Sequence, residues 1–292
     1  MAVDILVTGA AGVLGLQIVG VLRSAGYRVM ACGRRAAHGL DAVWDVSHQE
    51  TADPEVRPRV VVHAAARMGS YRQPLSAAMP LFEANVTGTL RVARWCESRH
   101  VERFVLVSGA IVYGRWDDSP KSETDLPDPW AAGPYAVSKW CSEQAASLIR
   151  NGETELTILR LSSLYGSGYV SGLPQRLLRE ARHDGTLALA PPLDDAFDLL
   201  HVADAARTVR LAVESEAPGL WNVGSGELTT VHRLGEVCAR QAGAIVGVSD
   251  ISPERPRRIL NWVDDGKARR ELGHVNELTL DAGVEEIARG LA

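Results

Sequence analysis

Residues 4–15 have the sequence Asp-Ile-Leu-Val-Thr-Gly-Ala-Ala-Gly-Val-Leu-Gly, and this stretch decides the fold. A short apolar run predicts a strand, and the apolar spacing over residues 13–24 predicts a helix that ends before Gly26. The first glycine between them permits a tight turn, the second lets the backbone approach a pyrophosphate, and the third lets helix and strand pack closely. The amino end of the helix attracts phosphate charge. The stretch therefore predicts a dinucleotide-binding βαβ unit, with cofactor contacts from Gly9, Ala11, Gly12, Val13, Leu14 and Gly15.

Strand and helix patterns alternate through the first half of the chain. Strands are expected at 27–32, 59–63, 103–108 and 156–161, and helices at 81–97 and 135–149. Such alternation is typical of a doubly wound parallel α/β sheet, the Rossmann class. After residue 161 turn signals crowd together, which predicts a smaller mixed α/β region over the carboxyl ends of the strands. We expect a dinucleotide-binding domain over 1–161, with a returning segment near 198–224, and a mainly substrate-binding region over 162–292.

Composition excludes several classes of protein. The 292 residues carry a formal net charge of −5 without a basic tract, which argues against binding nucleic acid. Four cysteines lie far apart, so free thiols are expected and no metal site is predicted. The apolar run over 5–22 lacks a basic leader, and no other stretch is long enough to span a bilayer. We expect a cytoplasmic protein that binds a small molecule, with His63 and His201 packed in the interior rather than binding a ligand.

The end of the second strand bears on the choice of dinucleotide. NAD-binding units place an acidic residue there for the adenosine ribose, but the sequence is Ala31-Cys32-Gly33-Arg34-Arg35. The acid's position falls at Gly33, and a guanidinium is a natural partner for a 2′-phosphate. Arg34 and Arg35 therefore favour NADP(H), with NAD(H) possible, although both arginines are also typical of a solvated loop. Asp45, with Val46 beside it, is a candidate partner for the adenine amino group.

Tyr135 and Lys139 lie four residues apart, on one face of a predicted helix. An unperturbed tyrosine, with a pKa of about 10, exchanges protons poorly at neutral pH. A nearby ammonium and the positive charge of an oxidised nicotinamide favour the phenolate and lower that pKa. The pair thus predicts an acid/base centre, whereas a surface Tyr and Lys at helical spacing is the plainer interpretation.

Together these motifs resemble the extended short-chain dehydrogenase/reductase family, in particular its NAD-dependent epimerase/dehydratase branch. The resemblance runs almost end to end, in the right order. It rests on Thr8 to Gly15, Val62-His63-Ala64-Ala65-Ala66, Asn85 to Thr89, Val112-Tyr113-Gly114, Tyr135 to Lys139, Leu159-Arg160, His201 to Asp204, Trp221 to Gly226, and Arg255-Pro256 followed by Asp264 to Gly273.

The resemblance implies a role for particular residues. Tyr135 would be the general acid/base, and Lys139 would bind the nicotinamide ribose and hold the tyrosine's pKa down. Asn85 would help to organise the site near the catalytic helix. The family also implies a homodimer formed through the helices at 81–97 and 135–149. Further contacts with the cofactor are implied for Ala64, Ala65, Ala66, Asn85 and Leu161, and with substrate for Arg67, Gly109, Ala110, Ser162, Ser163 and Arg255.

Two positions depart from the family pattern. Four residues before Tyr113 the family has Ser or Thr, whose hydroxyl binds the substrate oxygen, whereas this chain has Gly109. Ser108 is the nearest hydroxyl, and it is our candidate for this catalytic role if the strand end bulges there. Successive strand residues otherwise face opposite sides, which leaves Ser162, Ser163 or a water as alternatives. Four residues before His201, where nucleotide-sugar enzymes have an arginine for the diphosphate, stands Phe197. Arg255 keeps its expected place, and Arg257 or Arg258 are candidates to compensate.

The sequence therefore predicts an NAD(P)-dependent oxidoreductase or epimerase. It would act by hydride transfer at a hydroxyl/carbonyl carbon of a sugar-like substrate, which includes nucleotide sugars, with Tyr135 as acid/base. One alternative is an NADPH-dependent ketoreductase of a non-nucleotide small molecule. Another, suggested by Gly109 and Phe197, is a dinucleotide-sensing module without catalysis.

Overall fold

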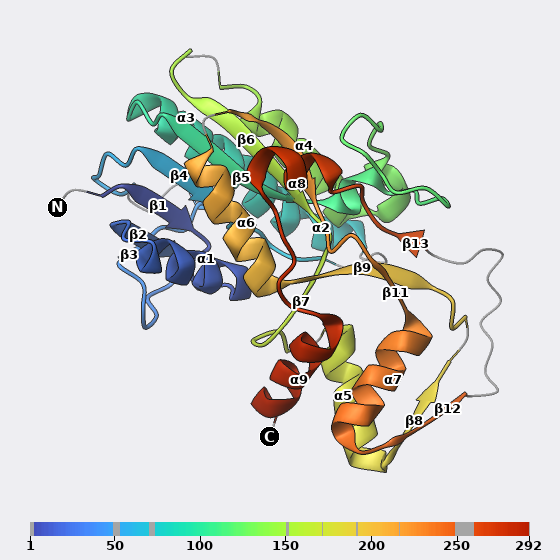
Figure 1. Ribbon diagram of the computed structural model, residues 1–292. Helices are drawn as coiled ribbons and strands as arrows, with labels where there is room; N and C mark the ends of the chain where they lie inside the picture. Colours follow the sequence, from blue (N-terminus) through green and yellow to red (C-terminus); the bar gives the residue numbers. More distant parts are fainter. Residues whose placement is uncertain are drawn as a thin grey trace.

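A computed structural model describes residues 3–48, 53–69, 74–149, 152–170, 172–190, 192–215, 217–248 and 260–291. Its centre is a seven-stranded sheet in the order β10-β6-β5-β4-β1-β2-β3 (Figure 1), in which every neighbouring pair is parallel. The expected α/β class is confirmed. The strands are β1 (Ile5–Thr8), β2 (Val29–Gly33), β3 (Ala42–Val43), β4 (Val60–His63), β5 (Arg103–Gly109), β6 (Glu155–Leu161) and β10 (Gly219–Val223).

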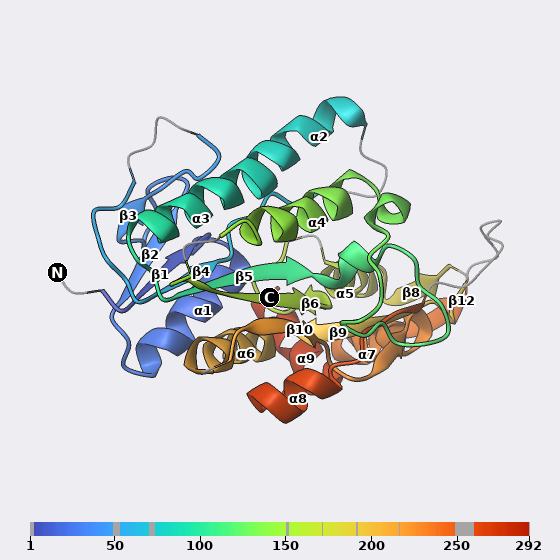
Figure 2. The ribbon, with the colours of Figure 1, turned by 90° about the horizontal axis from the view of Figure 1, so that it is seen from above.

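Helices cover both faces of this sheet, as Figure 2 shows. In β1, Ile5 and Val7 belong to one core cluster and Leu6 to the other, because successive strand residues face opposite sides. Continuous apolar strands are the consequence of this double cover. One face carries α1 (Val13–Ser24), α6 (Val202–Glu214) and α8 (Gly266–Leu272), and the other carries α2 (Leu75–Phe82), α3 (Gly88–Ser98) and α4 (Pro134–Ala146).

A smaller region follows β6, where the chain passes from the first sheet into a second. The strands β7 (Ser163–Tyr165), β9 (Ala196–His201), β11 (Leu228–Thr230) and β13 (Leu260–Asn261) form it, with β9 paired to the other three. Beside it, β8 (Thr186–Leu189) and β12 (Ile245–Val248) pair, and α5 (Leu173–Asp184), α7 (Val231–Ala242) and α9 (Leu280–Gly290) enclose a third apolar core. Between β9 and β11 the chain returns to the first sheet, as α6 and β10.

One expected helix differs from the structure. The segment 81–97 is not a continuous α-helix, because a π-helical turn at Glu83–Thr87 separates α2 from α3. A π turn holds one extra residue, so it re-aims the side chains that it carries. Within the described ranges, no helix is long and apolar enough to cross a membrane. The same residues contain no group of three potential His, Cys, Asp or Glu metal ligands.

Candidate active site

The loop between β1 and α1 is shaped for close approach by a ligand. Gly9 has a φ of +71°, and a Cβ there would come within 2.5 Å of the Ala65 nitrogen. A Cβ on Gly15 would collide with the carbonyl oxygen of Gly9. Only glycine fits at these two positions, which leaves the backbone and the amino end of α1 open to a phosphate group. These residues fit a dinucleotide.

A cavity of about 520 Å³ opens beside this loop. Asp45 lines it and is held by its neighbour, because its Oδ1 accepts hydrogen bonds from the Ser47 nitrogen (3.0 Å) and from the Ser47 hydroxyl. Val46 also lines the cavity, and its carbonyl oxygen accepts a hydrogen bond of 2.9 Å from Arg91 Nη1. The remaining lining residues are Gly9, Ala11, Gly12, Gly33, Arg34, Trp44, Ala64, Ala65, Ala66, Arg67, Met68 and Ala84.

A second cavity, of about 420 Å³, contains the expected acid/base pair. It shares the phosphate loop and Met68 with the first cavity, so one elongated ligand can reach from Asp45 to Tyr135. Its other lining includes Val13, Leu14, Gly15, Val107, Ser108, Gly109, Ala110, Leu161, Ser162, Ser163, Tyr169 and Asn261.

Tyr135 and Lys139 both project from α4 into the second cavity. The Tyr135 hydroxyl donates to the Met68 sulfur at 3.2 Å, and the Lys139 ammonium donates to the Val107 carbonyl oxygen at 2.8 Å. Burial lowers the pKa of Lys139 to about 8, because the charged form loses its hydration.

The polypeptide does not lower the pKa of Tyr135, contrary to the effect expected of Lys139. Burial, and to a smaller degree the neighbouring Tyr169, raise the pKa of Tyr135 to about 12. The physical reason is desolvation, which opposes formation of the phenolate. Tyr135 is therefore a protonated donor at neutral pH.

Ser108 does not offer its proton to the second cavity. Its hydroxyl donates to Glu143 Oε1 at 2.5 Å, and Glu143 forms a buried ion pair with Arg160 at 2.8 Å. A carboxylate in a buried pair needs such hydrogen bonds to offset its lost hydration. This geometry argues against Ser108 as the catalytic donor, in keeping with its one-residue offset from Gly109 along the strand.

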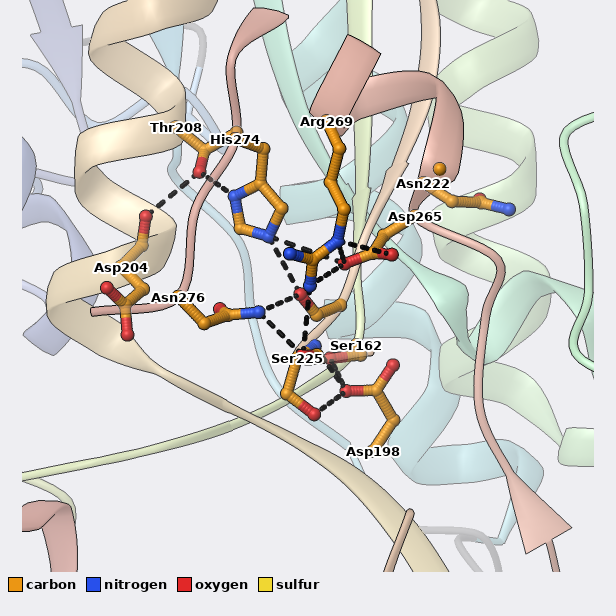
Figure 3. Close-up of polar contacts among 12 residues, drawn as sticks. Ser162, Asp198, Asp204, Thr208, Asn222, Ser225, Asp265, Arg269, His274 and Asn276 are labelled. Carbon is orange, nitrogen blue, oxygen red and sulfur yellow. Dashed lines mark hydrogen bonds and ion pairs between the residues drawn. The ribbon is translucent and has the colours of Figure 1, made fainter. Parts of the chain in front are cut away.

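Ser162 is engaged as well, in the polar network of Figure 3. Its hydroxyl donates to Asp198 Oδ1 at 3.1 Å, and the same oxygen accepts hydrogen bonds from the nitrogen (2.6 Å) and the hydroxyl (2.8 Å) of Ser225. Asp198 is fully buried, and burial raises the pKa of its carboxyl group. Ser163, another expected substrate contact, lines the second cavity, and its hydroxyl forms no hydrogen bond with the described part of the chain.

Two expected ligand contacts lie elsewhere. Asn85, in the π-helical turn, is buried outside both cavities. It accepts a hydrogen bond from the Arg67 nitrogen (2.7 Å), and it donates to the Arg67 oxygen (3.0 Å) and to the Ser138 hydroxyl (2.9 Å). It thus ties the loop that follows β4 to α4 instead of contacting the cofactor. Arg67, expected at the substrate, lines the first cavity rather than the second.

Fewer of the expected substrate contacts can be located in the structure. Phe197 lies in β9 beside Asn261, which lines the second cavity from β13. Arg255 lies outside the described residues, as do Arg257 and Arg258. Arg35 lines neither cavity, whereas Arg34 lines the first.

The sequence profile of the NAD-dependent epimerase/dehydratase family matches residues 5–224. The chain belongs to this family. It is 31% identical to 3-diazoavenalumate denitrifying reductase of a Streptomyces species over 82% of each chain. It is 27% identical to UDP-glucose 4-epimerase of Mycolicibacterium smegmatis over 96% of this chain and 95% of that one. The solved structure of MoeE5 in complex with UDP-glucuronic acid and NAD matches with a TM-score of 0.85 and 27% identity, over 99% and 98% of the two chains.

The residues that line the second cavity without having been predicted from the sequence include Met68, Tyr169 and Asn261. Two of these lie in turns and the third lies in a strand. Met68 follows the Ala64–Ala66 segment, and Tyr169 follows the glycine-rich turn after β7. Both residues follow the carboxyl end of a strand, where open α/β sheets bind ligands. Their position in the sequence could therefore have indicated a ligand contact. Asn261 carried no comparable signal, because it comes from a strand of only two residues in the second sheet.

Proposed function

We propose that this chain is an NADP(H)-dependent oxidoreductase or epimerase acting at a hydroxyl/carbonyl carbon of a sugar-like substrate, with Tyr135 as the acid/base. The observation that carries the proposal is the joint cavity. Tyr135 and Lys139 face the same space as the phosphate loop, and an unbroken lining connects that space to the adenine side. This is the arrangement that hydride exchange beside a proton donor requires.

A nicotinamide dinucleotide, when bound, supplies or accepts the hydride. In the reducing direction Tyr135 donates its proton to the carbonyl oxygen, and its raised pKa keeps that proton in place at neutral pH. The Lys139 ammonium, one turn further along α4, then stabilises the phenolate. Because the pKa of Lys139 is about 8, the ammonium loses its charge above that pH. In the oxidising direction the same proton returns to Tyr135.

NADP(H) is our preferred dinucleotide, although MoeE5 was solved with NAD. Gly33 ends β2 without a carboxylate, and Arg34 lines the adjoining cavity. A carboxylate at this place binds the ribose hydroxyls of NAD, whereas a guanidinium matches a 2′-phosphate.

Nucleotide sugars are the first substrates to test, because the similar epimerases act on them by name. Phe197 favours a second candidate, an NADPH-dependent ketoreductase of a non-nucleotide small molecule, because an apolar ring cannot neutralise a diphosphate. An epimerase retains its dinucleotide through a full cycle, and a reductase exchanges it. Denatured protein that releases stoichiometric oxidised dinucleotide would support epimerisation, and its absence would support reduction.

We also propose a homodimer formed through α3 and α4, which pack against each other on one face of the sheet. Leu90 on α3 is 38% exposed, and Leu148, just beyond α4, is 62% exposed. Burial of such side chains drives association. Light scattering on the purified chain tests this proposal, and a monomeric mass would contradict it.

Tyr135→Phe tests the acid/base assignment. We expect turnover to fall by about 10²- to 10⁴-fold, the usual contribution of a general acid, while the dissociation constant for NADPH stays the same. Steady-state assays and fluorescence titration measure the two quantities. Tyr27→Phe is the matched control, since Tyr27 lines neither cavity. A Tyr135→Phe enzyme with wild-type turnover would refute the proposed mechanism.

A further inference from the structure

The second cavity lacks a hydroxyl where the family has one. Gly109 leaves the substrate oxygen without its second donor, and a single donor controls the orientation of a carbonyl poorly. Five hydroxyl-bearing side chains line this cavity. The Ser108 and Ser162 protons are already donated, to Glu143 and to Asp198 respectively. Besides Tyr135, only Ser163 and Tyr169 remain among the described lining residues.

Tyr169 is carried by a turn that the fold holds in one place. The turn follows β7 and contains Gly166 with a φ of +140° and Gly168 with a φ of +95°. A Cβ on Gly168 would lie 3.3 Å from a methyl group of Val13, so the backbone of this turn rests on the start of α1. Tyr169 therefore lines the second cavity together with the phosphate loop and with Gly109, the last residue of β5.

The state of the Tyr169 hydroxyl suits a donor. It forms no hydrogen bond with any residue in the described ranges. Burial raises its pKa to about 12, so it keeps its proton throughout the neutral range. It also lies close enough to Tyr135 to raise the pKa of that residue, which places the two phenols in one local environment. A half-buried hydroxyl without a hydrogen-bond partner destabilises the folded protein unless a ligand or water accepts its hydrogen bond.

We propose that Tyr169 donates the second hydrogen bond to the substrate oxygen and replaces the hydroxyl that Gly109 lacks. This inference rests on the proposed hydride-transfer function. Tyr135 and Tyr169 would hold the carbonyl oxygen between two phenols, with Tyr135 transferring its proton and Tyr169 keeping its own. Ser163 is the competing donor.

The test measures NADPH oxidation with two probes, a nucleoside-diphosphate 4-keto sugar and 1-phenyl-1,2-propanedione. Tyr169→Phe should lower kcat/KM by roughly 10- to 100-fold, as expected for one lost hydrogen bond to a developing charge, without changing the dissociation constant for NADPH. Ser163→Ala should lower kcat/KM by less than Tyr169→Phe does. Ser167→Ala, in the same turn but lining neither cavity, is the matched control and should stay within about threefold of wild type.

A rescue variant separates this role from a folding defect. Gly109 has extended backbone with φ −144°, and a Cβ there would meet its nearest neighbour at 3.7 Å, so serine fits. Gly109→Ser in the Tyr169→Phe background should recover a large part of kcat/KM. Wild-type kcat/KM in Tyr169→Phe, a loss that follows Ser163→Ala instead, or no recovery in the double variant would each overturn the inference. Wild-type protein that binds NADPH but reduces neither probe would refute the proposed function itself.

Discussion

The phosphate loop and the substrate side of the second cavity recognise ligands in different ways. In the loop, the backbone itself is exposed to a ligand, because a Cβ on Gly9 or Gly15 would collide with neighbouring backbone atoms and both residues must be glycine. On the substrate side, the cavity is lined by side chains such as Tyr169, whose identity the fold does not require. Where the backbone binds the ligand, the close approach requires glycine at fixed positions. Where a side chain binds the ligand, other residues can replace it as long as one of them donates a hydrogen bond to the ligand. Family patterns are therefore kept at Gly9, Gly12 and Gly15 and broken at Gly109 and Phe197.

The largest effect should follow from adding one methyl group to the loop. Gly15→Ala places a Cβ on the Gly9 oxygen, so the loop must shift or α1 must move away. Overpacking of this kind costs about 3 kcal/mol, and the dissociation constant for NADPH should rise on the order of 100-fold. Gly20→Ala in the same helix is the matched control, because a Cβ there meets nothing within 4 Å. It should bind NADPH normally and gain about 0.5–1 kcal/mol in helix stability. Equal affinities of Gly15→Ala and Gly20→Ala for NADPH would contradict the idea that the loop backbone requires glycine at position 15.

A smaller effect is expected where a side chain, not the backbone, contacts the dinucleotide. Arg34→Ala should weaken NADPH binding by roughly 10-fold, the lower range for a hydrogen bond to a charged group, because Arg34 is exposed. NADH binding should be unchanged. Arg35→Ala is the control, since Arg35 lines neither cavity. Fluorescence titration with both dinucleotides measures the preference, and equal losses for NADPH and NADH would show that Arg34 does not recognise the 2′-phosphate.

The third effect concerns the acid stability of the sheet that carries the loop. His63 in β4 is fully enclosed between the Thr8 hydroxyl (2.6 Å) and the Thr89 hydroxyl (3.1 Å), and burial lowers its pKa to about 3. Between that value and the ordinary 6.5, the unfolded chain binds a proton that the folded chain does not. The free energy of unfolding should therefore fall as the pH drops below 6.5, by up to about 1.4 kcal/mol per pH unit from this group.

Urea unfolding at pH 7, 6 and 5 checks this slope. His63→Gln should lose less stability over that range than the wild type, although it starts from a lower value. His183→Gln, at an exposed histidine, should keep the wild-type slope. Parallel slopes for the wild type and His63→Gln would contradict the assignment of acid sensitivity to β4.

Sequence patterns predicted the parts of the molecule that the backbone determines. The strands β1, β2, β4, β5 and β6 and the helix α4 lie within a few residues of their expected ranges, because apolar spacing and glycine turns are local signals. The orientation of the Ser108 hydroxyl was not predictable, since it depends on Glu143 and Arg160, which are distant in sequence. The raised pKa of Tyr135 has the same origin, because burial is a property of the assembled fold.

The side-chain amide of Asn85 has a mechanical consequence. It forms hydrogen bonds with the backbone nitrogen and oxygen of Arg67 and with the Ser138 hydroxyl. It thereby connects the loop after β4 to the helix that carries Tyr135 and Lys139. These hydrogen bonds link two walls of the ligand channel directly, without a residue of the second sheet between them. We therefore expect that substitutions in the turn after β7 can change substrate preference while the spacing between that loop and the catalytic helix stays the same.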